Sequence, residues 1–181
     1  MNEADTCRKY IVPLLQAADW DNDPHSITEQ RYFTKGRVIV HGNRARRREG
    51  KKTDYLLRYT RDFILAVVEA KAIYKKAEDG LQQAKEYAQM LGLKFAYASN
   101  GEETIEFDFI TGIERKITEF PKPGELWNRL RQHEKLPDET AATRLLTPYN
   151  LTTGKEPHYY QQIAIILAPC HERPTQLGEA L

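Results

Sequence analysis

Two acidic residues and a lysine lie at the ends of two neighbouring predicted strands, an arrangement suited to metal-dependent chemistry. Asp54 directly precedes the strand predicted over 55–59, whereas Glu69 and Lys71 close the apolar strand predicted over 63–70. Because side chains alternate faces along a strand, Glu69 and Lys71 point the same way, about 6.7 Å apart at ~3.3 Å per residue. Charges beside a core strand are costly unless they are paired or bind a metal, so this cluster requires an explanation.

These three side chains fit a divalent-metal phosphodiesterase. Asp54 and Glu69 would supply oxygen ligands of the kind that Mg²⁺ takes, with water and a substrate phosphate in its remaining positions. Lys71 would hold the attacking water or neutralise the charge that develops on the phosphate. The alternative is a surface ion pair between Lys71 and Glu69. Short charge patterns are common, so Glu69 and Lys71 alone favour the ion pair. Asp54 makes the metal site more plausible but does not outweigh the ion pair.

A basic segment lies just before the first of these strands. Glu49 is the single acid between residues 35 and 52. The basic residues in this range are Lys35, Arg37, Arg44, Arg46, Arg47, Arg48, Lys51 and Lys52. Such a segment fits contacts to nucleic-acid phosphates, and a solvated loop without a ligand fits it equally well.

Three further polar residues are open to two interpretations. Gln83 and Tyr87 lie four residues apart on a predicted helix and share one face, which packing and solvent exposure explain without a function. Glu3, in the first turn of a predicted helix, is either an acid that complements the helix dipole or a third carboxylate for the metal. The sequence alone favours the interpretation without a catalytic role: packing for Tyr87, solvent exposure for Gln83 and a helix-dipole acid for Glu3.

The elements expected around these residues form a mixed α/β fold. We expect helices over 3–19 (kinked at Pro13), 78–91 (ended by Gly92) and 125–131. We expect strands over 30–33, 37–41, 55–59, 63–70, 93–99, 104–110 and 113–117. Residues 21–26 and 42–50 are predicted loops, and Glu106 and Asp108 are expected on the wetter face of the last hairpin. This order of elements predicts a mixed β-sheet flanked by helices.

The composition is that of an ordinary globular protein. The chain has 181 residues, of which 40% are hydrophobic and 29% charged, with a net charge of +1, and this fits one elaborated domain. The longest apolar runs, 63–68 and 163–169, are too short to span a bilayer, and the polar N-terminus does not match a signal peptide. Cys7 and Cys170 predict neither a disulfide framework nor a zinc site. We therefore expect a cytoplasmic protein.

Taken in order, these residues resemble the nuclease domain of the restriction (motor) subunit of type I restriction enzymes, a member of the PD-(D/E)xK nuclease superfamily. Asp54 matches the family's aspartate, Glu69-Ala70-Lys71 matches the ExK motif, and Gln83 and Tyr87 match the Q-x-x-x-Y motif. The blocks that resemble the family, in the correct order, are NEADTCRKYIVPLLQAADW, GRVIVHG, KKTDYLLRY, LAVVEAKA, LQQAKEYAQML, FAYASNG, FPKPGELW and EPHYYQQIAI. They cover most of residues 2–167, and the ordered series is more specific than any single motif.

The resemblance implies a restriction-endonuclease-like α/β core and a Mg²⁺-dependent endonuclease that cuts double-stranded DNA without reading its sequence. The implied catalytic residues are Asp54, Glu69, Lys71, Gln83 and Tyr87. Asp54 and Glu69 would bind the metal, with Glu3 nearby. The implied DNA-binding residues are Arg44, Arg46, Arg47, Arg48, Lys51 and Lys52, which would contact phosphates and position the duplex.

The resemblance also implies partners and a motor that these residues do not contain. The modification and specificity subunits would be partners, and Gln161 would read the adenine of ATP in the full-length motor subunit. The implied organisation is a nuclease domain over 1–135, a linker over 136–157 and a truncated stub of a motor domain over 158–181. His158 stands where the family usually has arginine, and the tail after Leu167 does not resemble a motor domain.

Two other functions fit the same residues. A stand-alone repair or junction-resolving nuclease would share the core, but it would not need the motor-entry segment at 159–163. A non-catalytic DNA-binding or docking module would not need to keep Asp54, Glu69, Lys71 and Gln83 intact.

Overall fold

The computed structural model describes residues 3–29, 32–33, 38–41, 44–47, 51–135 and 146. Its centre is a six-stranded sheet with the strand order β1-β6-β7-β8-β9-β10. The strands are β1 (Ser26–Glu29), β6 (Tyr55–Thr60), β7 (Phe63–Ala70), β8 (Phe95–Ser99), β9 (Thr104–Asp108) and β10 (Ile113–Ile117). Among these strands β7 and β8 are the parallel pair, and all other neighbours are antiparallel, so the sheet is mixed as predicted.

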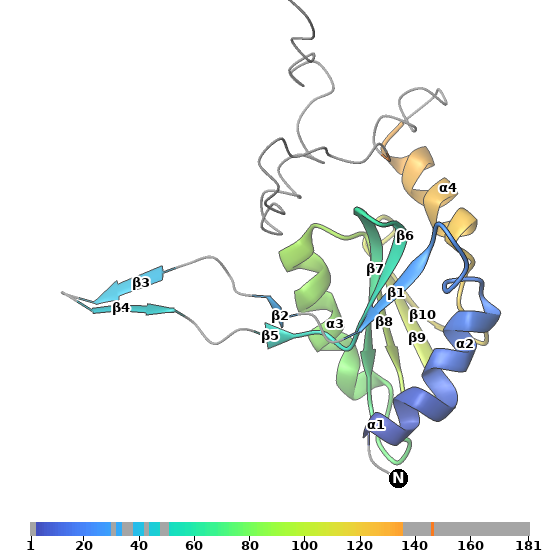
Figure 1. The fold of residues 1–181 in the computed structure, drawn as a ribbon, viewed down its shortest axis with the longest axis horizontal. Coiled ribbons are helices and arrows are strands. Elements are labelled where there is room, and N and C mark those ends of the chain that lie inside the picture. Colours follow the sequence, from blue (N-terminus) through green and yellow to red (C-terminus); the bar gives the residue numbers. More distant parts are fainter. Residues whose placement is uncertain are drawn as a thin grey trace, which may run out of the picture. The chain divides into compact units, whose positions relative to one another are not determined.

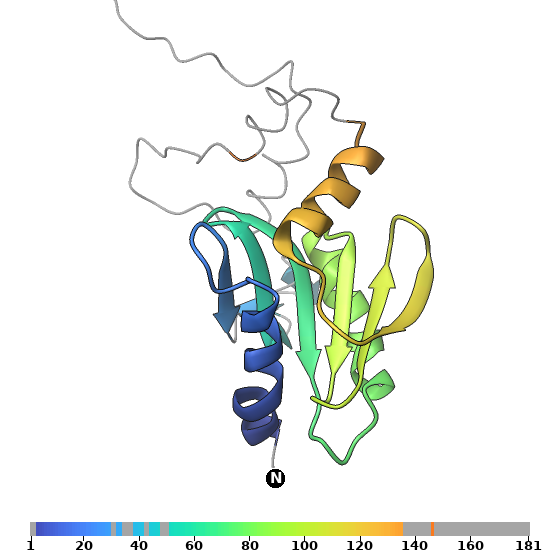
Figure 2. The same ribbon diagram turned by 90° about the vertical axis from the view of Figure 1, so that its right-hand side faces the viewer.

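Helices cover both faces of this sheet, as Figures 1 and 2 show. On one face lies α3 (Glu78–Leu91), which connects the parallel strands and buries Leu81, Ala84, Ala88 and Leu91 as predicted. On the other face lie α1 (Glu3–Thr6), the π-helical η1 (Cys7–Ile11), α2 (Val12–Ala17) and α4 (Pro123–His133). Within the described part of the chain, no helix has both the length and the hydrophobicity to cross a membrane.

The N-terminal segment, for which a helix over 3–19 that kinks or restarts at Pro13 was predicted, is helical, but the break takes an unpredicted form. A π-helical stretch, Cys7–Ile11, separates two short α-helices and comes shortly before Pro13. Proline cannot donate a backbone hydrogen bond, and its ring crowds the carbonyl one turn earlier. The regular ladder is therefore interrupted at this point, and the wider π-turn lies where the interruption falls.

Three of the described strands, β1, β4 (Arg44–Arg47) and β5 (Lys51–Lys52), were not predicted. The predicted loop over 42–50 contains β4, which pairs with β3 (Val38–His41). The sequence carries a signal for this hairpin, because the two residues Gly42-Asn43 between the strands are a typical two-residue connection. A further short pair joins β2 (Tyr32–Phe33), which lies inside the strand predicted over 30–33, to β5, for which no strand was predicted. β1 begins at the last residue of the loop predicted over 21–26 and continues over 27–29, for which no element was predicted.

The prediction that Glu106 and Asp108 face water was wrong. Glu106 is 1% exposed and Asp108 is 7% exposed. The Glu106 carboxylate accepts hydrogen bonds from Tyr97 Oη (2.8 Å), Arg115 Nε (3.0 Å) and Arg129 Nη2 (2.8 Å). Because Arg129 comes from α4, the burial of Glu106 depends on a helix that is distant in sequence, and strand alternation could not reveal it.

We expect Glu106→Gln to lower the free energy of unfolding by about 2–4 kcal/mol, since it leaves two arginines without their carboxylate. This loss of stability is smaller than that expected for breaking a fully buried ion pair, because the Arg115 side chain is 53% exposed. Urea unfolding measures the change. Glu103→Gln is the matched control, because Glu103 pairs with Lys116 at the surface (3.1 Å) and its loss should cost less than about 0.5 kcal/mol. Equal effects of the two changes would contradict a structural role for Glu106.

Candidate active site

The structure brings Asp54, Glu69 and Lys71 together at one end of the sheet. Asp54 lies at the entry to β6, and its Oδ2 accepts a hydrogen bond from the backbone N–H of Ala70 (2.8 Å). Glu69 ends the core strand β7, and its Oε1 accepts a hydrogen bond from Lys71 Nζ (3.0 Å). The antiparallel pairing of β6 with β7 places Tyr55 opposite Val68, so Asp54 reaches the backbone between the glutamate and the lysine.

Glu69 is a buried carboxyl with one unused oxygen. Its side chain is 4% exposed, and its Oε2 is buried without a hydrogen-bond partner in the part of the chain that the structure describes. Burial, and then the charge of Asp54, raise the pKa of Glu69 to about 8, although Lys71 acts to lower it. A buried carboxylate oxygen without a partner is unfavourable by itself, and a bound cation would satisfy it.

Lys71 keeps its proton near neutral pH. Burial opposes its charge, but the hydrogen bond and the charge of Glu69 outweigh burial and raise the pKa of Lys71. The charges of Glu3 and Asp54 act in the same direction. Lys71 is therefore suited to act as a cation and a hydrogen-bond donor, and it is not suited to accept a proton from water.

Gln83 and Tyr87 hold the chain that leads into Asp54. Gln83 Nε2 donates a hydrogen bond to Tyr87 Oη (3.0 Å), and Tyr87 Oη donates one to the backbone carbonyl of Lys52 (2.8 Å). Tyr87 is 2% exposed. Because Lys52 lies two residues before Asp54, these contacts tie α3 to the backbone that leads into Asp54.

Gly80 was not among the predicted site residues, but it packs directly against Lys71 and Glu69. It lies in the first turn of α3, where an added Cβ would lie 3.2 Å from Lys71 Cγ and Cε and 3.3 Å from Glu69 Cγ. A glycine inside a predicted helix is unfavourable and usually has a packing reason, so its presence was the available signal.

We expect Gly80→Ala to lower DNA cleavage about 10- to 100-fold, because the new methyl group displaces Lys71 and Glu69 from their positions. Gly124→Ala is the matched control. Gly124 also lies in the first turn of a helix, and a Cβ there meets nothing within 4 Å. We expect the control to cleave normally and to gain about 0.5–1 kcal/mol of stability. Equal cleavage by both variants would show that the close contact at Gly80 does not matter.

Comparison with known proteins identifies the relatives of this chain. No model of a known protein family matches it. It is 34% identical over 171 residues to the type I restriction enzyme EcoAI endonuclease subunit of Escherichia coli, covering 91% of this chain and 21% of that protein. A solved fragment described as an HsdR subunit of a type I restriction enzyme from Vibrio vulnificus YJ016 is 51% identical. Its TM-score is 0.81, over 92% of this chain and 31% of that one.

The chain is a homologue of the endonuclease subunit of type I restriction enzymes. The relationship confirms the restriction-endonuclease-like fold class, a mixed sheet flanked by helices. The chain spans only 21% of the length of the Escherichia coli relative and 31% of the Vibrio vulnificus chain.

The remaining residues predicted from the HsdR resemblance are only partly described. Glu3 is exposed, and its charge contributes to the raised pKa values of Glu69 and Lys71. The described residues contain no group of three or more His, Cys, Asp or Glu side chains that could hold a metal, so a ligand role for Glu3 stays a prediction. Of the six predicted DNA-binding residues, Arg44, Arg46 and Arg47 lie in β4, Lys51 and Lys52 lie in β5, and Arg48 lies outside the described residues.

The predicted linker and motor stub cannot be compared with the structure. Apart from Leu146, residues 136–157 lie outside the described residues, and so do 158–181 with Gln161.

Proposed function

We propose that this chain carries the nuclease centre of a type I restriction enzyme, which hydrolyses phosphodiester bonds of double-stranded DNA with Mg²⁺ and does not read base sequence itself. The observation that carries the proposal is the buried Oε2 of Glu69, which has no hydrogen-bond partner among the described residues and lies next to Asp54 and a protonated Lys71. The name of the Escherichia coli relative, an endonuclease subunit, supports the same function.

The donor set fits Mg²⁺. Proteins usually bind Mg²⁺ through one or two carboxylates, with water and substrate phosphate in the remaining positions. Asp54 and Glu69 provide two carboxylates at the same end of β7, because Asp54 is hydrogen-bonded to Ala70, the residue after Glu69. A third acid is therefore not required. When bound, Mg²⁺ would acidify a coordinated water and neutralise charge on the phosphate oxygens.

The chain's own residues would orient the reaction. The Ala70 N–H holds Asp54 through Oδ2, which fixes the carboxylate beside Glu69 and Lys71. Lys71 uses one of its three donors on Glu69, and its remaining donors would orient the attacking water or bind a phosphate oxygen as negative charge develops. Gln83 and Tyr87 would keep Asp54 in place through the Lys52 carbonyl.

The partners belong to the same proposal. We expect this chain to act in the cytoplasm, with duplex DNA and the modification and specificity subunits. ATP hydrolysis and translocation would belong to a part of the full-length relatives that this chain does not span.

The decisive experiment is nicking of supercoiled plasmid by this chain, alone and with its partner subunits. We expect nicking in Mg²⁺ or Mn²⁺ and none in EDTA. Cleavage by the chain alone, unaffected by the partner subunits, would favour a stand-alone nuclease. Failure to cleave under every condition, together with a silent calorimetric titration at millimolar metal with and without DNA, would favour a non-catalytic docking module.

A further inference from the structure

A short loop, residues 72–77, connects Lys71 to α3 and is held in place at several points. At its start the Lys71 N–H donates to the Ser99 carbonyl (2.8 Å), and the Ile73 N–H donates to Thr6 Oγ1 (3.1 Å). Asn100 Nδ2 donates to the Lys75 carbonyl (2.8 Å). The loop is thus fastened to the N-terminal helix and to the turn after β8, so its outward side chains start from a fixed backbone.

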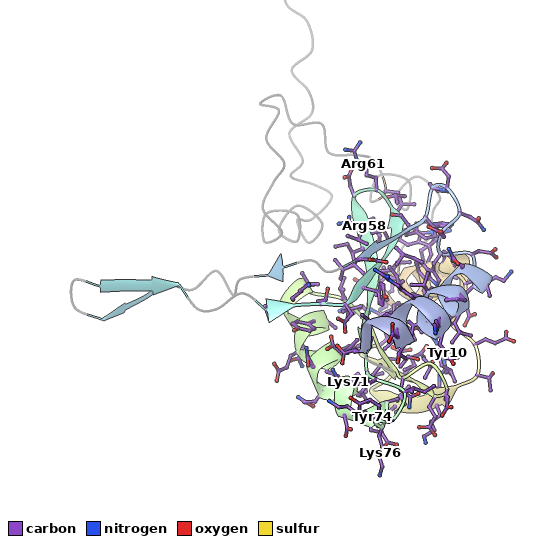
Figure 3. All side chains as sticks on the ribbon, turned by 60° about the horizontal axis from the view of Figure 1, so that its bottom comes forward. Tyr10, Arg58, Arg61, Lys71, Tyr74 and Lys76 are labelled. Atoms are coloured by element: carbon purple, nitrogen blue, oxygen red, sulfur yellow. The ribbon has the colours of Figure 1, made fainter. Side chains whose placement is uncertain are left out.

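The outward side chains are an aromatic residue and two cations. Tyr74 is 74% exposed, and among the described residues the only other large hydrophobic side chain that is exposed is Ile113, at 57%. Ile113 lies at the opposite end of the sheet, since it pairs with Asp108 and Asp108 pairs with Phe95 at the start of β8. In Figure 3, Lys71, Tyr74 and Lys76 lie along the same edge of the molecule.

Among the described residues, Lys75 and Lys76 differ from four other lysines in having no acidic partner. Both are exposed, and neither forms an ion pair with any described residue, not even with the nearby acids of α3. By contrast, a carboxylate lies within 4 Å of the Nζ atoms of Lys85, Lys94, Lys116 and Lys122. The loop therefore presents two lysines that form no ion pair with a described residue, within five residues of the proposed catalytic lysine.

We propose that this loop is a contact surface for duplex DNA, with Lys75 and Lys76 binding backbone phosphates and Tyr74 packing against a sugar or base edge. The inference rests on the proposed nuclease function, because a strand bound at Lys71 must continue over the surface beside it. Unpaired lysines complement the phosphate charge and position the duplex. An exposed aromatic ring on a fixed backbone adds contact area at little cost in conformational freedom.

The test is DNA binding by the 181-residue chain, measured by fluorescence anisotropy with a labelled duplex of arbitrary sequence in EDTA at several salt concentrations. Each phosphate contact contributes about 0.9 to the slope of log affinity against log salt. We therefore expect Lys75→Gln/Lys76→Gln to reduce that slope by about 1–2 and to weaken binding about tenfold at low salt. Tyr74→Ala should weaken binding about tenfold, whereas Tyr74→Phe should retain it.

The matched control is Lys94→Gln/Lys135→Gln, which removes the same charge at the opposite end of the sheet. Wild-type affinity and slope in the loop variants, or an equal loss in this control, would overturn the inference. Because the assay needs no cleavage, plasmid nicking by the unmodified chain with its partner subunits judges the proposed function separately. If the unmodified chain nicks plasmid and the loop variants bind like wild type, only the loop inference fails.

Discussion

Replacing Lys71 with alanine is expected to lower DNA cleavage by a factor of about 10²–10⁴ while the protein remains folded. Lys71 provides the protonated amine at the site, and its hydrogen bond to Glu69 (3.0 Å) fixes the position of that charge. Its loss also removes an influence that lowers the pKa of Glu69. Residual cleavage should therefore need a higher pH than wild-type cleavage, as single-turnover rates across pH would measure.

The control for this change is Lys85→Ala. Lys85 also pairs with a glutamate, Glu114 of β10, at 2.8 Å, and its Nζ lies over the Phe107 ring of β9, so these contacts do not involve Asp54 or Glu69. In the assembled enzyme, Asp54→Ala should lose cleavage as Lys71→Ala does, while ATP hydrolysis persists in both. Full cleavage by either of these variants would remove the catalytic assignment.

The sequence predicts the elements that carry the site more accurately than the elements at its borders. The apolar run of β7 and the periodic stripe of α3 were predicted with the bounds that the structure has. Gly92 ends α3 with φ of 68°, a left-handed conformation that glycine adopts without strain. These features are local, because an apolar run, a helical period and a turn residue can each be recognised within a short window.

The features that the sequence did not predict depend on contacts between distant segments. Glu106 is buried because Arg129 of α4 reaches it, 23 residues later. The close packing of Gly80 against Lys71 arises only when α3 lies across the end of β7. Motif spacing indicated which residues meet at the site. Coordinates were needed to show that Oε2 of Glu69 has no hydrogen-bond partner among the described residues, and that Tyr87 anchors the Lys52 carbonyl.

Replacing Glu69 with glutamine is expected to abolish cleavage and, in metal-free buffer above pH 8, to make the folded protein more stable. In the folded state, burial and the charge of Asp54 raise the pKa of Glu69 from 4.5 to about 8. Between these values the folded protein holds a proton that the unfolded chain has released. The free energy of unfolding therefore falls as the pH rises through this window, and the loss is complete above about pH 8.

Glutamine resembles the neutral carboxyl group and does not titrate, so the variant escapes this loss. The shift corresponds to a gain on the order of 3–5 kcal/mol at most, reduced by the lost ion pair with Lys71. Thermal unfolding in EDTA should show little difference between variant and wild type near pH 5, and a clearly higher Tm for the variant at pH 9. Glu114→Gln, at a glutamate that is 47% exposed and also paired with a lysine, is the control and should change Tm little at either pH.

Metal should reverse the order of stability at high pH. In the proposed function Mg²⁺ would bind the ionised Glu69 of the folded state, so added Mg²⁺ should raise the Tm of the wild type and leave that of Glu69→Gln unchanged. Equal stabilisation of both proteins by Mg²⁺, or a Tm difference that does not depend on pH, would contradict the role of Glu69. The predicted outcome follows from one property of this carboxyl group: its burial disfavours the charge that a bound cation requires, so the stability lost without metal is regained when metal binds.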